Sequence, residues 1–343
     1  MSKHRTAEME ESMMSTAEEP KKDEAARRAV ITLLRPLGEV REIVALTGGM
    51  FASTYRVTFA AGTLVVAKLT GADPGKLCRY ERGIARTEAQ TYRVLSNHGL
   101  PAPEVLLTDF SHVYVDADVV VTRHLSGTPW NETALDEVSS AQVRRRLGAA
   151  MAQLHRIRPP AFGYPALQAG MQAATWRDAF VLMVEGLVSD AADVGTNLPV
   201  AEIRAAIARH ADALDAVKVP SLVHADLWAA NVFLGAGLEI TGIIDTERTV
   251  WGDPLLDLVG ADQLGLWDVD PDLVSGNTDS GGVLADELAS PFGPLRFALC
   301  RLYFALILNV EIDVRGYDGD WVPEHRAMVR GLLHATLERL SCS

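Results

Sequence analysis

The stretch LVHADLWAAN, residues Leu222–Asn231, places polar side chains where chemistry could occur. His224, Asp226 and Asn231 follow two apolar residues that are typical of a short buried strand. Three interpretations compete: a metal site, a hydrogen-bonded turn, or a catalytic loop. On a continuing strand, His224 and Asp226 would point to opposite faces, which disfavours a zinc site built from the two.

The spacing His-x-Asp-x-x-x-x-Asn is typical of a loop for phosphoryl transfer. In such a loop the aspartate accepts the proton of an attacking hydroxyl, and the asparagine holds a divalent cation beside the phosphates. This pattern makes Asp226 a candidate base and Asn231 a candidate metal ligand. Asp245 follows Asn231 by 14 positions, at the end of the strand-like run ITGII. A second metal-binding carboxylate is needed at that place.

Upstream residues could hold the phosphates of a nucleotide. Lys68 interrupts the apolar run LVVAKLT, so it is either an edge-strand charge or a buried, paired cation. Glu88, on the following helix, could pair with it, although alone it is typical of a solvated helix charge. Gly48 and Gly49 could cover phosphates with backbone N–H groups, together with Ser53, although a Gly-Gly pair alone is typical of a simple hairpin.

The surrounding pattern predicts two lobes in the 343 residues. β-rich runs within Arg41–Thr70, a helix over Glu81–Asn97 and two further strand-like runs predict a small antiparallel sheet. Beyond residue 125 the pattern is mainly helical. We therefore predict an α+β fold with a flexible tail (1–22), a sheet lobe (23–124) and a helical lobe (125–343).

In the helical lobe we predict six helices and one long loop. Ser140 is the expected N-cap of its first helix, and the Gly/Asp/Ser-rich stretch Asp268–Ser290 is expected to be a mobile loop. The expected helices are Ser140–Arg156, Thr175–Ala192, Val200–Val217, Pro254–Gly265, Pro291–Val314 and Pro323–Leu340.

Charge and composition exclude several functions. The formal net charge is -13, and the stretch Asp245–His325 alone carries sixteen Asp/Glu against four Lys/Arg. Such an acidic body argues against nucleic-acid binding and against anionic membranes. It is compatible with a cationic substrate or a divalent metal, but also with a surface that only serves solubility.

The cysteines and the N-terminus indicate a cytoplasmic protein. Three widely spaced cysteines form no CxxC pair, which indicates reduced thiols rather than a zinc knuckle. The first residues lack the apolar segment of a signal peptide, although Met1 and Met14 both remain possible starts. The apolar run Pro294–Val310 contains Arg296 and Arg301, so we expect a buried helix rather than a membrane span.

Two motifs carry a family resemblance. HADLWAANVFL and IIDTERTVWGDPLLDL resemble the aminoglycoside phosphotransferase/choline kinase-like superfamily, in a layout spanning Arg41–Leu340. The resemblance implies a bilobal protein-kinase-like fold and phosphorylation of a small-molecule hydroxyl with ATP or GTP and Mg²⁺. It implies Asp226 as catalytic base and Asn231 and Asp245 as magnesium ligands.

The resemblance also assigns supporting roles. Lys68 would bind phosphate while held by Glu88, and His224 would buttress the loop. Asp253 and Asp257 would orient the loop and a helix N-terminus. The segment Thr122–Leu125, with Thr122 and His124 among the nucleotide-binding candidates, would contact the nucleobase through backbone groups.

The sequence departs from the family pattern at three places. Ala225 replaces a common glycine, Asp-Thr-Glu stands where protein kinases have Asp-Phe-Gly, and Arg123-His124 occupies a hinge that is often acidic. The second departure favours a small-molecule acceptor over a protein. The third leaves the choice between ATP and GTP open.

Acidic residues late in the chain predict a cationic, amine-bearing acceptor such as an antibiotic or a sugar. An alternative is a metabolic kinase for fructosamine, choline or an amino sugar, and a non-enzymatic alternative is a nucleotide-binding pseudokinase. The pseudokinase is disfavoured because Lys68, Asp226, Asn231 and Asp245 are all present. The acids expected at the acceptor site are Asp262, Asp268 and Glu311, with Asp270, Asp272 and Asp313 nearby in sequence.

Overall fold

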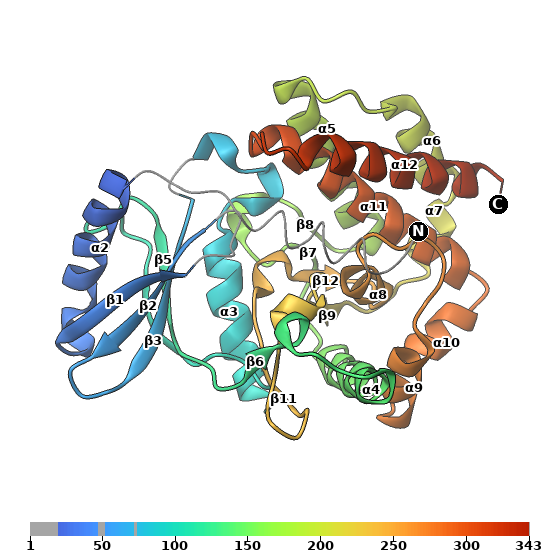
Figure 1. Ribbon diagram of the computed structural model, residues 1–343. Coiled ribbons are helices and arrows are strands. Elements are labelled where there is room, and N and C mark those ends of the chain that lie inside the picture. The colour runs from blue at the N-terminus through green and yellow to red at the C-terminus, as the bar shows by residue number, and fades with distance from the viewer. Residues whose placement is uncertain (1–19, 47–51, 72–73, 343) are drawn as a thin grey trace.

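The computed structural model describes residues 20–46, 52–71 and 74–342. A sheet-containing lobe lies beside a larger, mainly helical lobe (Figure 1). This arrangement confirms the predicted α+β, bilobal fold. Gly48 and Gly49 lie outside the described residues, as do residues 1–19 of the predicted tail.

The sheet of the first lobe is antiparallel throughout and has the order β1-β2-β3-β5-β4. Burial alternates along its central strands, because every second side chain faces the same layer. In β2 the buried residues are Tyr55, Val57 and Phe59, and β3 follows the same rule. The strands are β1 (Val40–Leu46), β2 (Ser53–Phe59), β3 (Leu64–Thr70), β4 (Val105–Asp109) and β5 (Asp118–Arg123).

Helices cover both faces of this sheet (Figure 1). On one face, α2 (Pro20–Leu34) packs Val30 and Leu34 against the buried side chains of β2, β3 and β5. It includes residues 20–22, which were predicted to belong to the flexible tail. On the other face, α3 (Ile84–Asn97) packs Ala85 and Ala89 against Val120. Lys68 on β3 and Glu88 on α3 therefore face one another across the sheet surface.

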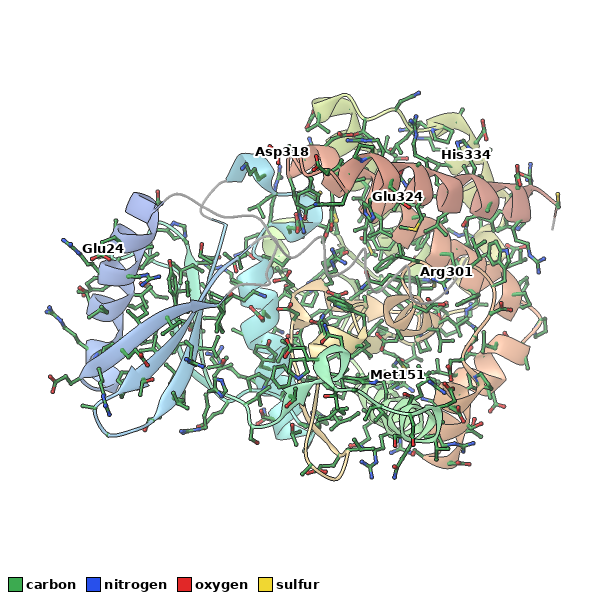
Figure 2. The ribbon with its side chains drawn as sticks, in the orientation of Figure 1. Glu24, Met151, Arg301, Asp318, Glu324 and His334 are labelled. Carbon is green, nitrogen blue, oxygen red and sulfur yellow. The ribbon has the colours of Figure 1, made fainter. Side chains whose placement is uncertain are left out.

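The second lobe is built around two long helices, α5 and α11, with one large apolar core. Met151 of α4 is fully buried within it (Figure 2). Cys78 and Tyr80, which precede α3, belong to this core rather than to that of the sheet lobe. The helices are α4 (Glu137–Leu154), α5 (Trp176–Val194), α6 (Val200–Arg209), α7 (Ala211–Asp215), α8 (Leu255–Ala261), α9 (Pro271–Asp279), α10 (Leu284–Ala289), α11 (Gly293–Val314) and α12 (Val322–Ser341).

Two small sheets frame the loop that follows residue 223. β9 (Ser221–Val223) pairs with β12 (Val250–Gly252), and β10 (Val232–Leu234) forms a hairpin with β11 (Ile240–Ile243). The loop between β9 and β10 is thereby pinned at both ends. The remaining short strands are β6 (Thr128–Pro129), β7 (Phe162–Gly163) and β8 (Gln172–Ala173).

The prediction of a mobile loop over Asp268–Ser290 is wrong, because α9 and α10 occupy it. Asp270 caps α9 by accepting from the backbone N–H groups of Asp272 and Leu273. Its glycines serve packing: a Cβ on Gly276 would stand 2.0 Å from the carbonyl oxygen of Arg145 on α4. The glycines that make this stretch resemble a loop in sequence allow α9 to approach α4 closely.

Two helix predictions also need correction. Asp136 rather than Ser140 caps α4, since its carboxylate accepts from the backbone N–H of Ser139. The expected single helix Val200–Val217 is divided into α6 and α7 at His210. Within the described ranges, no helix combines the length and apolarity needed to cross a membrane. The apolar helix α11 buries Arg296 and Arg301 inside the lobe.

Candidate active site

The catalytic-loop candidate begins with a left-handed residue. β9 ends at Val223, and Ala225 adopts a φ of 63°, a conformation that favours glycine. Its backbone N–H donates to Asp257 Oδ1 at 2.8 Å, and Asp257 Oδ2 is 2.8 Å from His155 Nε2. Asp257 is fully buried. The turn therefore breaks the strand alternation, and α8 holds it in place.

His224 holds this loop through hydrogen bonds at both ring nitrogens. Its Nε2 lies 2.9 Å from the carbonyl oxygen of Ile244, and its Nδ1 accepts from the backbone N–H of Asp226 at 3.2 Å. Such contacts assign the proton to Nε2 of a neutral ring. Burial lowers the pKa of His224, which agrees with the neutral form. His224 thus ties the loop to the end of β11, as a positioning residue.

Asp226 lies at the centre of the loop with a largely buried carboxylate. Gln263 Nε2 donates to its Oδ1, and Arg248 Nη1 lies 3.7 Å from the same oxygen. Burial raises the pKa of Asp226 to about 7, with the nearby acids Asp245 and Glu247 adding to the rise and Arg248 opposing it. A carboxylate with a pKa near neutrality is suited to accepting a proton.

Asn231 links the loop to the second polar centre. Its Nδ2 donates to the carbonyl oxygen of Asp226 at 2.9 Å, which leaves Oδ1 as a ligand atom. The carbonyl oxygen of Asn231 accepts from the backbone N–H of Ile244 at 3.0 Å. Asn231 therefore lies next to the chain segment that leads into Asp245.

Lys68 and three carboxylates form that second centre, here called the Lys68 cluster: Lys68, Glu88, Asp245 and Glu247. Lys68 Nζ lies 2.6 Å from Asp245 Oδ1, 2.6 Å from Glu247 Oε2 and 3.1 Å from Glu88 Oε1. Burial alone would lower the pKa of Lys68, but the three carboxylates outweigh it and hold the pKa well above its ordinary value. The lysine is therefore charged.

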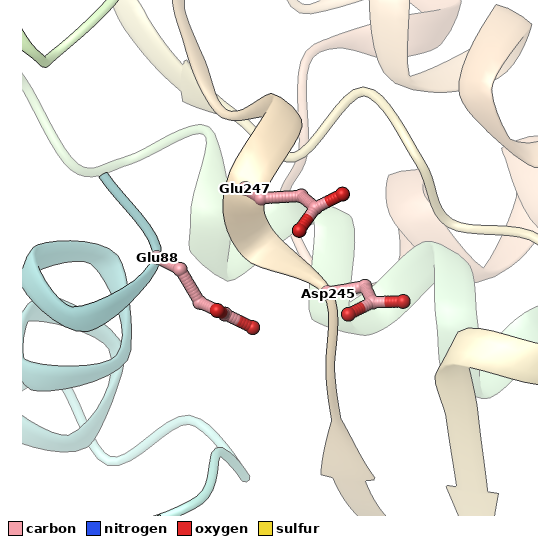
Figure 3. Close-up of side chains that lie close together, drawn as sticks. All are labelled: Glu88, Asp245 and Glu247. Atoms are coloured by element: carbon pink, nitrogen blue, oxygen red, sulfur yellow. The ribbon is translucent and has the colours of Figure 1, made fainter. Parts of the chain in front are cut away.

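The carboxylates of this cluster converge from two elements (Figure 3). Glu88 comes from α3, whereas Asp245 and Glu247 flank the start of the short 3₁₀ turn Thr246–Arg248. One oxygen from each lies within 4.8 Å of the others. Tyr92 fixes the arrangement, since its hydroxyl donates to Glu88 Oε1 at 2.9 Å and accepts from the backbone N–H of Asp245 at 3.0 Å.

The donor set fits a hard divalent cation. Burial raises the pKa of Glu88 to about 7, and its Oε2 is buried without a hydrogen-bond partner. Burial opposes ionisation of Asp245 as well, but Lys68 outweighs it and lowers the pKa of Asp245. One ammonium group facing three carboxylates leaves excess negative charge, and oxygen ligands of this kind are those that Mg²⁺ prefers.

The remaining nucleotide-binding candidates lie on the same sheet. Ser53 is exposed at the start of β2, opposite Leu69 and thus next to Lys68 in register. Thr122 is buried in β5 opposite Val66, and the backbone N–H of His124 donates to the carbonyl oxygen of Leu64 at 3.1 Å. Asp253 accepts two hydrogen bonds from Arg296, at 2.8 and 2.7 Å, and is structural.

The expected acceptor acids are dispersed, and Glu311 is not open to a substrate. Its two oxygens accept from Arg248 Nη2 at 2.9 Å each, Tyr80 donates to it, and Arg315 lies 3.4 Å away. Asp262 is exposed and lies 3.6 Å from Arg301. Asp268 is exposed, whereas ion pairs engage Asp270, Asp272 and Asp313.

Three residues of the site were missed from sequence. Glu247 stands two positions after Asp245, so the Asp-x-Glu spacing itself was a usable signal. Arg248 follows directly and bridges Asp226 and Glu311. Gln263 contacts Asp226 only because of how α8 packs, and no local motif marks it.

The model of the phosphotransferase enzyme family, APH, matches residues 42–273, which include both polar centres. The chain belongs to this family. It is therefore a phosphotransferase, as the sequence resemblance implied. No match was found among curated protein sequences.

Solved structures show the same fold at low sequence identity. A thermostable mutant of aminoglycoside phosphotransferase APH(4)-Ia, in a ternary complex with AMP-PNP and hygromycin B, is 20% identical, with a TM-score of 0.63. The match covers 90% of this chain and 97% of that one. A candidate fructosamine-3-kinase from Thermobifida fusca YX-ER1 is also 20% identical, with a TM-score of 0.60 over 90% and 98% of the two chains.

Proposed function

We propose that this APH-family member transfers the γ-phosphoryl group of ATP to a hydroxyl of a small, amine-bearing molecule. The observation that carries the proposal is the pairing of two centres in one site. A buried carboxylate with a pKa of about 7, Asp226, lies within electrostatic range of Asp245 and Glu247 in the Lys68 cluster. A base beside a phosphate-and-metal site is the arrangement that phosphoryl transfer requires.

Different residues would bind the phosphates, the rest of the nucleotide and the metal. Lys68 would neutralise phosphate oxygens, and Ser53, Thr122 and His124 lie along the strands that would hold the nucleotide. Asn231, Asp245 and Glu247 would hold Mg²⁺. The cation, when bound, supplies charge neutralisation across the phosphates. Because Lys68 contacts Asp245 directly, phosphate binding would draw the ammonium group partly away from that carboxylate.

The transfer step follows from the position of Asp226. The acceptor oxygen attacks the γ-phosphorus in line, and the bond between that phosphorus and the bridging oxygen breaks. ADP leaves with the electron pair of that bond. Asp226 takes the proton of the acceptor hydroxyl and later releases it to solvent. Positioning and electrostatics provide most of the rate, since little covalent chemistry falls to the protein.

The acceptor class rests on charge and on the fold neighbours. The stretch Asp245–His325 keeps its excess of acids, and Asp262 and Asp268 are exposed beyond α8, where they could attract an amine. The neighbour APH(4)-Ia was crystallised with hygromycin B and AMP-PNP, which supports an antibiotic-like acceptor and an adenine nucleotide. The structural match to a candidate fructosamine-3-kinase supports a second candidate, a kinase for glycated amines.

A nucleotide-consumption assay tests the proposal. ATP and GTP consumption with Mg²⁺ would be measured across aminoglycosides, other antibiotics, choline, amino sugars and fructosamines, with Asp226→Ala as the blank. We expect acceptor-dependent turnover of ATP that the variant loses. Turnover of neutral sugars without turnover of amines would overturn the acceptor class. Nucleotide binding with no transfer to any acceptor or to water would favour the pseudokinase.

A further inference from the structure

The C-terminal end of α8 lies against the catalytic-loop candidate without intervening side chains. A Cβ on Gly260 would stand 2.5 Å from the carbonyl carbon of Ala225 and 2.9 Å from the backbone nitrogen of Asp226. The backbones therefore touch at the base itself. With Asp257 bonded to the backbone N–H of Ala225 one turn earlier, α8 and the loop form one rigid unit.

The residues after α8 are also fixed. Arg301 of α11 is buried inside the helical lobe (Figure 2). It donates to the carbonyl oxygen of Asp262 and lies 3.6 Å from the Asp262 carboxylate. Gln263 follows Asp262 and is half-buried. The backbone that carries the Gln263 side chain is thus held by the contact between Arg301 and Asp262. A rigid support of this kind is what holds a functional side chain in a productive geometry.

Gln263 directs its amide at one oxygen of the base. Gln263 Nε2 donates to Asp226 Oδ1, and Arg248 Nη1 lies 3.7 Å from the same atom. Arg248 is itself held by both oxygens of Glu311. Within residues 20–46, 52–71 and 74–342, no side chain donates a hydrogen bond to Asp226 Oδ2. The two oxygens of the carboxylate are therefore not equivalent.

We propose that Gln263 is a positioning residue that holds Oδ1 of Asp226, so that Oδ2 faces the acceptor hydroxyl. This inference rests on the proposed phosphotransferase function and deepens it. Rotation of the carboxylate about its Cβ–Cγ bond would otherwise spread both oxygens over several orientations. Near-attack geometry depends on such orientation, so the amide acts on the rate of transfer rather than on substrate binding. Oδ2 takes the proton as the acceptor oxygen bonds to phosphorus and ADP departs.

The test is the steady-state kinetics of Gln263→Met, which keeps the length of the side chain and removes its donor. We expect kcat to fall roughly 10- to 100-fold, since the lost hydrogen bond is to a charged group. KM for nucleotide and for acceptor should stay within about twofold, because uniform binding is unchanged. Gln153→Met, on the exposed face of α4, is the matched control and should behave as wild type.

A double-mutant cycle separates positioning from a merely structural role. In an Asp226→Asn background, Gln263→Met should leave the residual rate unchanged within about threefold, because the group it orients is no longer a base. If Gln263→Met does not fold, Gln263→Ala carries the same cycle. Wild-type kcat in the single variant, a rise in acceptor KM alone, or additive losses in the cycle would each overturn the inference. A wild-type protein without any phosphoryl transfer would instead overturn the proposed function, and the inference with it.

Discussion

Around Lys68 one ammonium group faces three carboxylates. A second group of charged side chains, which contacts Asp226 through Arg248, has equal numbers of arginines and glutamates. The second group, here called the Arg315 cluster, comprises Glu81, Arg248, Glu311 and Arg315. Arg315 Nη2 lies 2.5 Å from Glu81 Oε1, and Arg248 donates to both oxygens of Glu311. The Lys68 cluster has excess negative charge that a cation can balance. The Arg315 cluster is complete without a ligand.

The Lys68 cluster is therefore a site whose charged groups can take a ligand as a new partner. The Arg315 cluster is a scaffold whose ion pairs stay the same. In the Lys68 cluster the side chain of Asp245 is 39% exposed, so ligands can reach it. In the Arg315 cluster Glu81 is fully buried and Arg315 nearly so. Burial of a charge is tolerated only when it is paired and hydrogen-bonded. Asp226 lies between the two clusters and is influenced by both.

The largest expected effect is on the base itself. Asp226→Asn keeps the shape of the side chain but cannot accept the proton, so kcat should fall by about 10³-fold or more. Nucleotide affinity should change little, because the Lys68 cluster is intact. Stopped-assay kinetics and nucleotide titration measure the two quantities. A variant with kcat near that of the wild type would show that Asp226 is not the base.

Removal of the Lys68 ammonium group should affect both activity and stability. In Lys68→Met, three carboxylates lose their partner, and loss of one member of a buried pair costs about 3–5 kcal/mol. Mg²⁺ at roughly 100-fold above its Kd should return about 2.7 kcal/mol. Chemical denaturation with and without Mg²⁺ measures this, with the exposed Lys218→Met as control. Stability that is insensitive to Mg²⁺ would argue against a cation site here.

The Arg315 cluster should respond differently to the same treatment. Arg315→Met leaves Glu81 buried without this partner and should also cost about 3–5 kcal/mol. Mg²⁺ should not restore the loss, because these acids are paired behind Asp226 rather than exposed to ligands. Arg204→Met, which removes an exposed pair with Glu185, is the control and should change the melting temperature little. Rescue of Arg315→Met by Mg²⁺ would remove the distinction between the clusters.

The smallest effect is a displaced pH profile. Asp226 must be unprotonated to accept a proton, and burial raises its pKa to about 7. The acid limb of kcat/KM should therefore be centred near pH 7, with activity falling about tenfold for each pH unit below it. Rates measured from pH 5 to 9 at constant ionic strength test this. An acid limb of kcat/KM centred near the ordinary carboxyl value would contradict a raised pKa of Asp226 in the free enzyme.

The sequence predicted those parts of the site that depend on local spacing. The residues from His224 to Asp245 lie in one loop and one hairpin, so their separation in sequence fixes their separation in space. Lys68 and Glu88 were also expected to pair, and Nζ and Oε1 lie 3.1 Å apart. That pairing depends on a strand followed by a helix packed on its face, which hydrophobic periodicity reveals.

The sequence could not reveal contacts that depend on tertiary packing. Gln263 reaches Asp226 because Gly260 lets α8 touch the loop, and nothing local marks either residue. The same reason explains the error over Asp268–Ser290. Glycine is common in loops and in close helix contacts, and only the partner helix α4 distinguishes the two uses. Glu311 was assigned to the acceptor site as one of the late acidic residues, because sequence alone does not reveal its partner Arg248, 63 positions away.

The division of the apolar core also bears on how this protein unfolds. One cluster unites α2 with β2, β3 and β5, and a separate cluster runs from Cys78 to Leu340 through the helical lobe. Lys68 and its carboxylates link the lobes through polar contacts. Helix α3 links them through apolar ones, because Ala89 packs against Val120 and Leu95 belongs to the helical-lobe cluster. We expect the two larger apolar cores to unfold as two cooperative units with separate melting transitions. A ligand that binds both lobes couples them, so the nucleotide complex should unfold as a single unit.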